Sequence, residues 1–334
     1  MRPFAYTAPT TVAEAIDALV ASGPGTKFLA GGTYLYDLMR LEVETPPAVV
    51  DIHRLAELNT IDTTGPTQLV FGSGARMSDL AEDPIVKADY PALSESLWRA
   101  ASQQLRNMAT LGGNLLQRTR CGYFRGGPTY ACNKRKPGSG CDALGGIDAG
   151  HAVLGVSDAC IATYPGDFAI ALIAFDAVVD VASPRGERTV ALADLHLEPG
   201  DTPHLEHTLA ADELILRIRV PVTPAGRAST YLKIRPRESY AFALASAAAA
   251  LSLDGDGTVE DCRIALGGVA TRPWRATAAE ESLIGGALTG RAARRAGEIA
   301  FAGARPGRDN AFKVELGIRT VADALRIAGE RATR

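Results

Sequence analysis

Four of the five cysteines in this 334-residue chain fall within a stretch of 40 residues, which makes them the first candidates for chemistry. Their spacing is Cys121-x10-Cys132-x8-Cys141-x18-Cys160. Zinc sites are usually built from C-x2–4-C pairs, and no such pair occurs in this sequence. Four thiolates match the requirement of a [4Fe–4S] cluster, whose negative charge the neighbouring run Lys134-Arg135-Lys136 would offset. The spacing therefore favours an iron–sulfur cluster over a zinc ion.

Two other interpretations of the cysteines stay open at this point. The first is four buried structural thiols, since free cysteine packs as a small apolar side chain. The second is a zinc-bound interaction protein without redox chemistry. Disulfides are disfavoured because the N-terminus has no basic region followed by an apolar stretch, so no secretion signal is predicted. The fifth cysteine, Cys262, lies in a predicted core strand and is expected to be a plain buried thiol.

Two diglycine segments stand where backbone N–H groups are able to approach a phosphate. Ala30-Gly31-Gly32-Thr33 joins a predicted strand to a predicted helix, and Thr110-Leu111-Gly112-Gly113-Asn114 is a predicted loop after a helical stretch. Without a Cβ, glycine lets the main chain come close to a pyrophosphate, and a following helix N-terminus favours negative charge. An ordinary tight turn explains either segment alone equally well. Neither segment fits G-x-G-x-x-G or the Walker pattern, so neither a Rossmann fold nor a P-loop is predicted.

The other polar motifs indicate no further catalytic chemistry. The five histidines show neither H-x-x-x-H nor H-E-x-x-H spacing, and none is predicted to be catalytic. No serine lies in a G-x-S-x-G context, so a hydrolase has no support. The net charge of −3 argues against binding to nucleic acid or to an anionic membrane.

The elements that position these residues begin with a predicted strand, glycine turn, helix and strand unit. A capping box at Thr11-Val12-Ala13-Glu14 starts a helix that ends near Ala21. A second α/β portion follows, with a helical stretch around residues 91–108 and a strand near 177–181. The remaining elements predicted before residue 60 are a short buried strand at 27–30, a helix at 35–41 and a strand at 48–52.

The hydropathy pattern changes after residue 226. Asp254-Gly255-Asp256-Gly257 is a strong hairpin signal between strands predicted at 240–253 and 259–269. The nearly apolar run from Phe242 to Leu253 is too short to span a bilayer and is expected to be a buried strand. Alanine-rich helices are predicted at 276–288, 291–302 and 321–332, which indicates a C-terminal α+β domain after a linker at 221–226.

Several segments, taken in this order along the chain, carry a resemblance to a known family. They are Lys27-Phe28-Leu29-Ala30-Gly31-Gly32-Thr33, the stretch from Gln104 to Arg118, Cys132-Asn133-Lys134-Arg135, Pro137-Gly138-Ser139-Gly140-Cys141 and the stretch from Ser239 to Leu244. The chain resembles the flavin-binding subunits of the molybdenum hydroxylases, which include xanthine dehydrogenase, carbon monoxide dehydrogenase and 4-hydroxybenzoyl-CoA reductase. Within that family it is most similar to the FAD and iron–sulfur subunits of bacterial aldehyde oxidoreductases.

The resemblance implies an α+β chain with an FAD-binding fold of the vanillyl-alcohol-oxidase (PCMH) type and a C-terminal domain of the CO dehydrogenase flavoprotein type. The FAD-binding domain is expected at residues 1–224, with subdomains at about 1–58 and 59–224. An insert that holds a [4Fe–4S] cluster is expected at about 118–162. The C-terminal α+β domain is expected at 225–334.

The same resemblance implies that FAD lies between these parts. The two diglycine segments would bind its pyrophosphate. Asp167 matches a family aspartate near the ribityl chain and the ring, Lys233 matches a lysine near the isoalloxazine, and Leu214 matches a leucine that packs against the flavin. The full set of residues expected to bind FAD is Phe28, Leu29, Ala30, Gly31, Gly32, Thr33, Tyr34, Leu35, Thr110, Gly112, Gly113, Asn114, Asp167, Leu214 and Lys233. The expected cluster ligands are Cys121, Cys132, Cys141 and Cys160.

The function implied by the resemblance is electron transfer, without a catalytic residue for an organic substrate in this chain. A large partner subunit would use a molybdenum cofactor to oxidise an aldehyde to a carboxylic acid. Two [2Fe–2S] clusters of a small partner would pass electrons to FAD here and on to an external acceptor, in a heterotrimer. The alternative partner is a 4-hydroxybenzoyl-CoA reductase with electrons running the other way. The expected compartment is the cytoplasm, or the periplasm by co-export with a signal-bearing partner, and no membrane insertion is expected.

Overall fold

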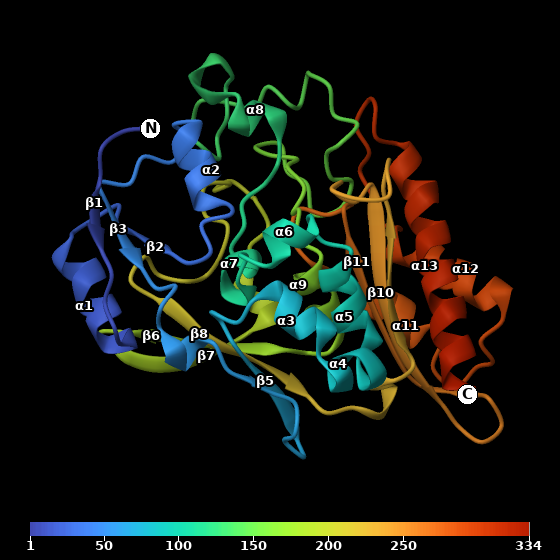
Figure 1. Ribbon diagram of the computed structural model, residues 1–334. Coiled ribbons are helices and arrows are strands. Elements are labelled where there is room, and N and C mark those ends of the chain that lie inside the picture. The colour runs from blue at the N-terminus through green and yellow to red at the C-terminus, as the bar shows by residue number, and fades with distance from the viewer. Residues whose placement is uncertain (334) are drawn as a thin grey trace.

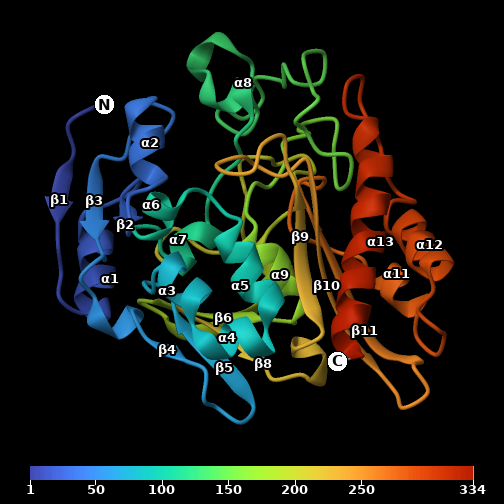
Figure 2. The ribbon, with the colours of Figure 1, turned by 45° about the vertical axis from the view of Figure 1, so that its right-hand side comes forward.

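Residues 1–333, the part of the chain that the computed structural model describes, contain three separate β-sheets (Figure 1). The first sheet belongs to the N-terminal unit, the second lies in the middle, and the third packs beside the C-terminal helices (Figure 2). Helices pack against all three sheets, as expected for the predicted α+β class. Within residues 1–333, no helix is both long enough and apolar enough to span a bilayer.

The first sheet has three parallel strands in the order β1-β3-β2, formed by Ala5–Thr7, Ala48–Asp51 and Lys27–Leu29. Helix α1 (Val12–Ala21) links β1 to β2, and helix α2 (Leu35–Arg40) links β2 to β3. The predicted capping box is confirmed, because Glu14 N donates to Thr11 Oγ1 and Thr11 N donates to Glu14 Oε2, each at 3.2 Å. The prediction that β2 is buried is wrong, since its residues are exposed or half-buried along the wall of a cavity.

The central sheet has five antiparallel strands in the order β4-β5-β8-β6-β7. Helix α9 contacts the third sheet and shares the largest hydrophobic core with the central sheet: all seven residues of Phe168–Ala174 are buried in that core. The strands are β4 (Ile61–Asp62), β5 (Gln68–Gly72), β6 (Val178–Ser183), β7 (Gly186–Ala191) and β8 (Leu214–Pro221). The neighbouring helices are η1 (Ala56–Leu58), α3 (Met77–Glu82), α4 (Pro84–Asp89), α5 (Pro91–Trp98) and α10 (Leu192–Leu195).

Two secondary-structure predictions for this central region are wrong. The helical stretch predicted over residues 91–108 is divided into α5 and α6 (Gln103–Arg106), because Ala101 between them has a φ of 48° that an α-helix does not accommodate. The predicted loop at residues 110–114 is a short helix, α7 (Leu111–Leu115), that contains both glycines. Helix α7 forms because Thr110 caps it: Gly113 N donates to Thr110 Oγ1 at 3.3 Å.

The third sheet is antiparallel, in the order β12-β11-β10-β9, formed by Trp274–Arg275, Val259–Gly267, Ala245–Leu253 and Ser229–Ile234. Strand β10 is mostly alanine and is buried on both faces. Ala248 and Ala250 belong to the core that the sheet shares with α5 and α9, whereas Ala247 and Ala249 belong to a core under the C-terminal helices. Those helices are α11 (Thr277–Glu281), α12 (Gly290–Ala300) and α13 (Phe312–Ala332), and the 3-10 turn η3 (Pro224–Gly226) precedes the sheet.

Three C-terminal expectations need correction. The strand predicted from residue 240 begins at Ala245; Tyr240 has a φ of 52° and Phe242 is 49% exposed, so the segment before β10 is a loop. The helix predicted at 276–288 ends at Glu281, because Gly285 has a φ of 75° and residues 285–286 hydrogen-bond to β11 instead. The helix predicted at 321–332 is the second half of the longer α13. The Asp254–Gly257 hairpin is confirmed by the pairing of β10 with β11.

The cysteine segment, residues 118–163, lies between α7 and α9 and contains little regular structure. Its helices are the single turns α8 (Gly122–Arg125) and η2 (Gly127–Thr129). In Figure 1 this segment forms the upper part of the molecule, between α2 and the C-terminal helices. Its apolar residues pack on other parts of the chain: Phe124 and Cys132 contact Leu38 of α2, and Val153 and Leu154 join the core under the C-terminal helices.

Candidate functional site

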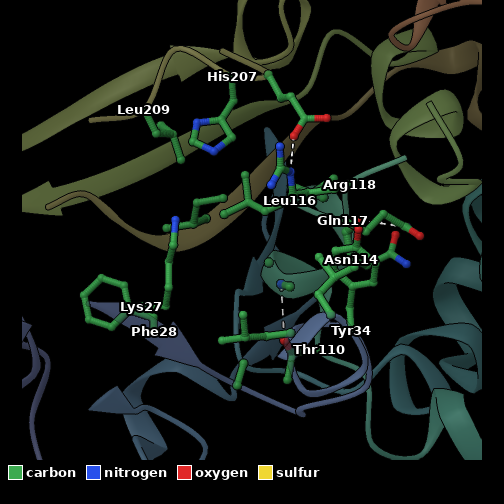
Figure 3. Close-up of a pocket in the computed structure, with 18 of the residues that line it drawn as sticks. Lys27, Phe28, Tyr34, Thr110, Asn114, Leu116, Gln117, Arg118, His207 and Leu209 are labelled. Carbon is green, nitrogen blue, oxygen red and sulfur yellow. Dashed lines mark hydrogen bonds and ion pairs between the residues drawn. The ribbon is translucent and has the colours of Figure 1, made fainter. Parts of the chain in front are cut away.

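A cavity of about 600 Å³ lies between the N-terminal unit and the central sheet, within the roughly 300–1,000 Å³ typical of ligand sites. Figure 3 shows Lys27 and Phe28 on one side of it, facing Tyr34 and Asn114 on the other, with His207 and Leu209 along a third wall. The walls therefore come from segments far apart in the sequence: β2 with the loop to α2, α6 with α7, and the stretch before β8.

The glycines of the two predicted phosphate segments are required by the packing of the chain itself. A Cβ on Gly31 would lie 1.8 Å from Met108 O, and Gly32 has a φ of 68°. A Cβ on Gly112 would lie 2.8 Å from Ser73 Cβ. Close approach at these positions brings the loop before α2 against the residues that precede α7. The glycines thus build the wall of the cavity, whatever else their N–H groups bind.

Several buried polar atoms on this wall have no hydrogen-bond partner within residues 1–333. An unpaired buried polar group costs about 1–3 kcal/mol, so their concentration around one cavity indicates a polar ligand that supplies the partners. FAD, a dinucleotide with a diphosphate, hydroxyls and ring nitrogens, fits such a polar wall. The atoms are Tyr34 OH, Ser73 Oγ, Asn114 Oδ1, Arg120 Nε, His196 Nδ1 and His207 Nδ1.

The charges around the cavity divide into compensated and uncompensated groups. Arg118 forms ion pairs with Glu206 and Glu44, and Lys134 Nζ lies 2.9 Å from Glu206 Oε1. Burial alone would raise the pKa of Glu206, but Lys134 and Arg118 outweigh it and hold that pKa below its usual range. These four side chains therefore form a balanced network.

Arg120 has no acidic partner within salt-bridge distance among residues 1–333, although it lines the cavity. Its Cζ lies 4.2 Å from the ring centroid of Tyr34 and 5.1 Å from that of Phe242, which belongs to the loop before β10. Burial lowers the pKa of Arg120, yet a guanidinium stays protonated at any physiological pH. Arg120 is thus a fixed positive charge offered to an anionic ligand.

Of the residues expected to bind FAD, thirteen line this one cavity: Phe28, Leu29, Ala30, Gly31, Gly32, Thr33, Tyr34, Leu35, Thr110, Gly112, Gly113, Asn114 and Leu214. Asp167 and Lys233 lie elsewhere, as a buried ion pair with Lys233 Nζ 2.8 Å from Asp167 Oδ2. Tyr231 OH donates to Asp167 Oδ1 at 2.6 Å, and Lys233 Nζ donates to Arg99 O at 3.1 Å. This pair joins the start of α9 to β9 and so ties the central core to the third sheet.

Sequence reasoning missed several polar wall residues. Lys27 directly precedes the expected site residue Phe28, and Arg118 ends a segment that carries the resemblance, whereas Arg120 lies two residues beyond that segment. Glu206 and His207 lie in a stretch without any recognisable pattern, so only the fold brings them to the cavity. The missed polar wall residues include Lys27, Glu44, Ser73, Arg118, Arg120, Lys134, His196, Glu206 and His207.

All four predicted cluster ligands line a second, small cavity in the cysteine segment, together with Phe124 and Lys134. All are free thiols, as is Cys262, which is buried in β11 as expected. Burial raises the pKa of Cys121 to about 11 and also raises that of Cys160, so these thiols keep their protons until a metal displaces them. No three His, Cys, Asp or Glu side chains within residues 1–333 converge closely enough to bind one metal ion.

Polar side chains fix the backbone around these cysteines. Cys132 N donates to Ser139 Oγ at 3.0 Å, and Ala162 N donates to Cys160 Sγ at 3.4 Å. Arg135 Nη1 donates to Tyr123 O at 2.9 Å and to Phe124 O at 2.7 Å, which anchors α8. The basic run Lys134-Arg135-Lys136 therefore fixes the backbone by hydrogen bonds as well as adding positive charge.

Comparisons with known proteins agree with this geometry. Residues 2–223 match the family described as the FAD binding domain in molybdopterin dehydrogenase, and residues 230–326 match the CO dehydrogenase flavoprotein C-terminal domain. The chain is 47% identical over 334 residues to the aldehyde oxidoreductase FAD-binding subunit PaoB of Escherichia coli K12, covering 99% of this chain and 100% of that protein. It is 30% identical to the carbon monoxide dehydrogenase medium chain of Hydrogenophaga pseudoflava, covering 92% and 88%.

Solved structures agree as well. The structure of carbon monoxide dehydrogenase from Hydrogenophaga pseudoflava matches with a TM-score of 0.77 at 29% identity, covering 99% of both chains. Quinoline 2-oxidoreductase from Pseudomonas putida 86 matches with a TM-score of 0.76 at 25% identity, covering 100% of this chain and 99% of that one. These matches confirm the predicted fold. The chain belongs to the molybdenum hydroxylases, a family of oxidoreductases, as an FAD-binding medium subunit.

Proposed function

We propose that this chain is the FAD and [4Fe–4S] electron-transfer subunit of a heterotrimeric, molybdenum-dependent aldehyde oxidoreductase. The observation that carries the proposal is that all four clustered cysteines line one cavity of an FAD-binding medium subunit. The 47% identity to a subunit named for aldehyde oxidoreductase supports the choice of branch. The domain border is placed at residues 224–225, inside η3 and between β8 and β9.

FAD would be held in the 600 Å³ cavity, where it supplies exchange between two-electron and one-electron redox partners. The chain's own part is to bind and orient it. Backbone N–H groups at residues 30–35 and 110–114 would face the diphosphate, and Arg120 would add a fixed positive charge. Leu214 would offer an apolar contact to the ring, and the Asp167–Lys233 pair would hold the region next to the ring in one conformation.

The cluster would be held by Cys121, Cys132, Cys141 and Cys160. A [4Fe–4S] cluster places one thiolate on each of four irons, so its ligands stand further apart than the ligands of a single ion. A site where four thiols share a cavity without converging on one point is consistent with that requirement. Lys134 lines both cavities and adds positive charge beside the cluster site.

The partners proposed are a large subunit with a molybdenum cofactor, which oxidises an aldehyde to a carboxylic acid, and a small subunit with two [2Fe–2S] clusters. Electrons would reach the FAD of this chain from the small subunit and leave to an external acceptor. The substrate site would therefore lie on the large subunit. The compartment proposed is the cytoplasm, or the periplasm if a partner carries the export signal.

The test is to purify the chain with its copurifying subunits and to measure flavin, iron and molybdenum together with activity. We expect one FAD for each chain, iron in excess of that in two [2Fe–2S] clusters, and oxidation of benzaldehyde with an artificial acceptor. Turnover of 4-hydroxybenzoyl-CoA without aldehyde oxidation would assign the reductase instead. A colourless protein that contains zinc but no flavin would overturn the proposal.

A further inference from the structure

His151 is not one of the expected site residues, yet its side chain contacts one of them, Cys121. Its Nε2 lies 3.2 Å from Cys121 Sγ, within hydrogen-bonding distance for a sulfur acceptor. The ring is buried, with 7% of the residue exposed. The sequence predicts no catalytic or metal-binding role for this histidine, since its spacing fits no metal motif.

The position of His151 is set by the C-terminal part of the chain. His151 N donates to Asp148 O at 2.8 Å, and Asn310 Nδ2 donates to His151 O at 3.5 Å. The Asp148 carboxylate in turn accepts from Arg308 N at 2.9 Å and Asp309 N at 2.7 Å. The residues that precede α13 therefore clamp the backbone on both sides of the imidazole.

The chemistry of the contact fixes which atom carries the proton. A ligating thiolate has no proton to donate, so a hydrogen bond to it requires Nε2–H. The other ring nitrogen, Nδ1, is buried and has no hydrogen-bond partner within residues 1–333, so the Nε2–H tautomer breaks no hydrogen bond of the ring. Cys121 also stands at the N-terminus of α8, with Tyr123 N and Phe124 N near its sulfur. Its sulfur is thus surrounded by donors.

We propose that His151 is a positioning residue whose Nε2–H donates a hydrogen bond to Cys121 Sγ and raises the reduction potential of the [4Fe–4S] cluster. This inference rests on the proposed function, because it requires the cluster. The reduced cluster carries one more negative charge than the oxidised one, and a donor to a ligand sulfur stabilises that charge. Removing the donor therefore favours the oxidised form.

The test compares His151→Phe, which keeps an aromatic ring without a donor, with His151→Gln, which keeps a donor. Exposed His53, outside both cavities, provides the matched control His53→Phe. Each full-length variant is purified anaerobically, its iron and sulfide are quantified, and the cluster potential is measured by redox titration followed by low-temperature EPR. We expect His151→Phe to lower the ratio of reduced to oxidised cluster about tenfold at a fixed potential, a fall of about 59 mV for one electron.

Supporting results would be a wild-type potential in His53→Phe, a smaller shift in His151→Gln than in His151→Phe, and loss of one exchangeable proton coupling in the ENDOR spectrum of His151→Phe. An unchanged potential and unchanged ENDOR couplings in an iron-loaded His151→Phe protein would overturn the inference. If phenylalanine prevents cluster assembly, His151→Leu takes its place under the same criteria. Absence of iron–sulfur cluster from the wild-type chain would instead refute the proposed cluster, so the two failures are distinguishable.

Discussion

The flavin cavity and the cysteine segment differ in how much regular structure surrounds them. The cavity is walled by a strand, two short helices and the approach to β8, and its glycines are fixed by contacts with neighbouring backbone. The cysteine segment has only single-turn helices and is fixed by side chains such as Arg135 that bond to backbone carbonyls. The proposed FAD would thus be held by the shape of the main chain, whereas the proposed cluster would be held by particular side chains of a segment with little regular structure.

The comparison predicts that each site can be emptied without the other. Cys132→Ser removes one ligand and should abolish most cluster binding while leaving FAD bound, because Cys132 lines the small cavity and not the large one. Iron and flavin content of the purified variant measure both effects. Cys262→Ser is the control, since Cys262 lies in β11 away from both cavities. Unchanged iron in Cys132→Ser would remove that cysteine from the ligand set.

Glu206 lies where the flavin cavity and the cysteine segment meet, so a substitution there affects both regions. It pairs with Arg118 on the flavin side and with Lys134, which lines both cavities. Removing one partner of a fully buried ion pair costs about 3–5 kcal/mol, and this network is only partly buried, so Glu206→Gln should lower the unfolding free energy by about 1–3 kcal/mol at neutral pH and weaken both sites. Denaturant unfolding at pH 7 measures the loss.

The pH dependence gives a second measurement on the same residue. The folded pKa of Glu206 lies below its unfolded value, so the stability that it contributes is present above about pH 4.5 and is lost as the pH falls through the folded pKa. The Glu206→Gln variant should lack this part of the loss of stability at low pH. Identical acid profiles for wild type and Glu206→Gln would show that the network is not a source of stability.

Gly31→Ala tests whether the flavin wall depends on close backbone approach. The added Cβ would lie 1.8 Å from Met108 O, so the loop must move, at a cost of about 1–3 kcal/mol. We expect FAD affinity to fall by about tenfold or more while iron content stays unchanged. Flavin fluorescence during reconstitution measures the affinity. Gly290→Ala, where a Cβ meets nothing within 4 Å, should bind FAD like the wild type.

Arg120→Met should have the smallest effect of these changes. Losing one charged donor from the cavity is worth about 1.5 kcal/mol, which corresponds to roughly a tenfold weaker affinity for FAD. Because riboflavin lacks the diphosphate, its binding should change less than that of FAD. The exposed Arg54→Met serves as control. An equal loss for FAD and riboflavin would place Arg120 against the ring rather than the diphosphate.

Local signals predicted the parts of the molecule that local chemistry determines. The capping box at Thr11 and the Asp254–Gly257 hairpin were readable because their hydrogen bonds connect residues a few positions apart. The four clustered cysteines were singled out by their spacing, and the fold brings them to one small cavity, while their role as cluster ligands stays a prediction. Arg120 and Glu206 were not, since the fold brings their segments to the cavity across long sequence separations. The α7 helix was missed because two glycines disfavour a helix that the Thr110 cap and Ser73 packing support.

The alanines of β10 point alternately into two cores, and this affects where the chain can be cut into fragments. One face of the strand completes the core around α9, and the other completes the core under α13. A fragment that stops at residue 223, where the first family match ends, would leave the α9 face uncovered and expose apolar surface prone to aggregation. The two parts of the chain that the family matches cover therefore share one hydrophobic core across the border between them.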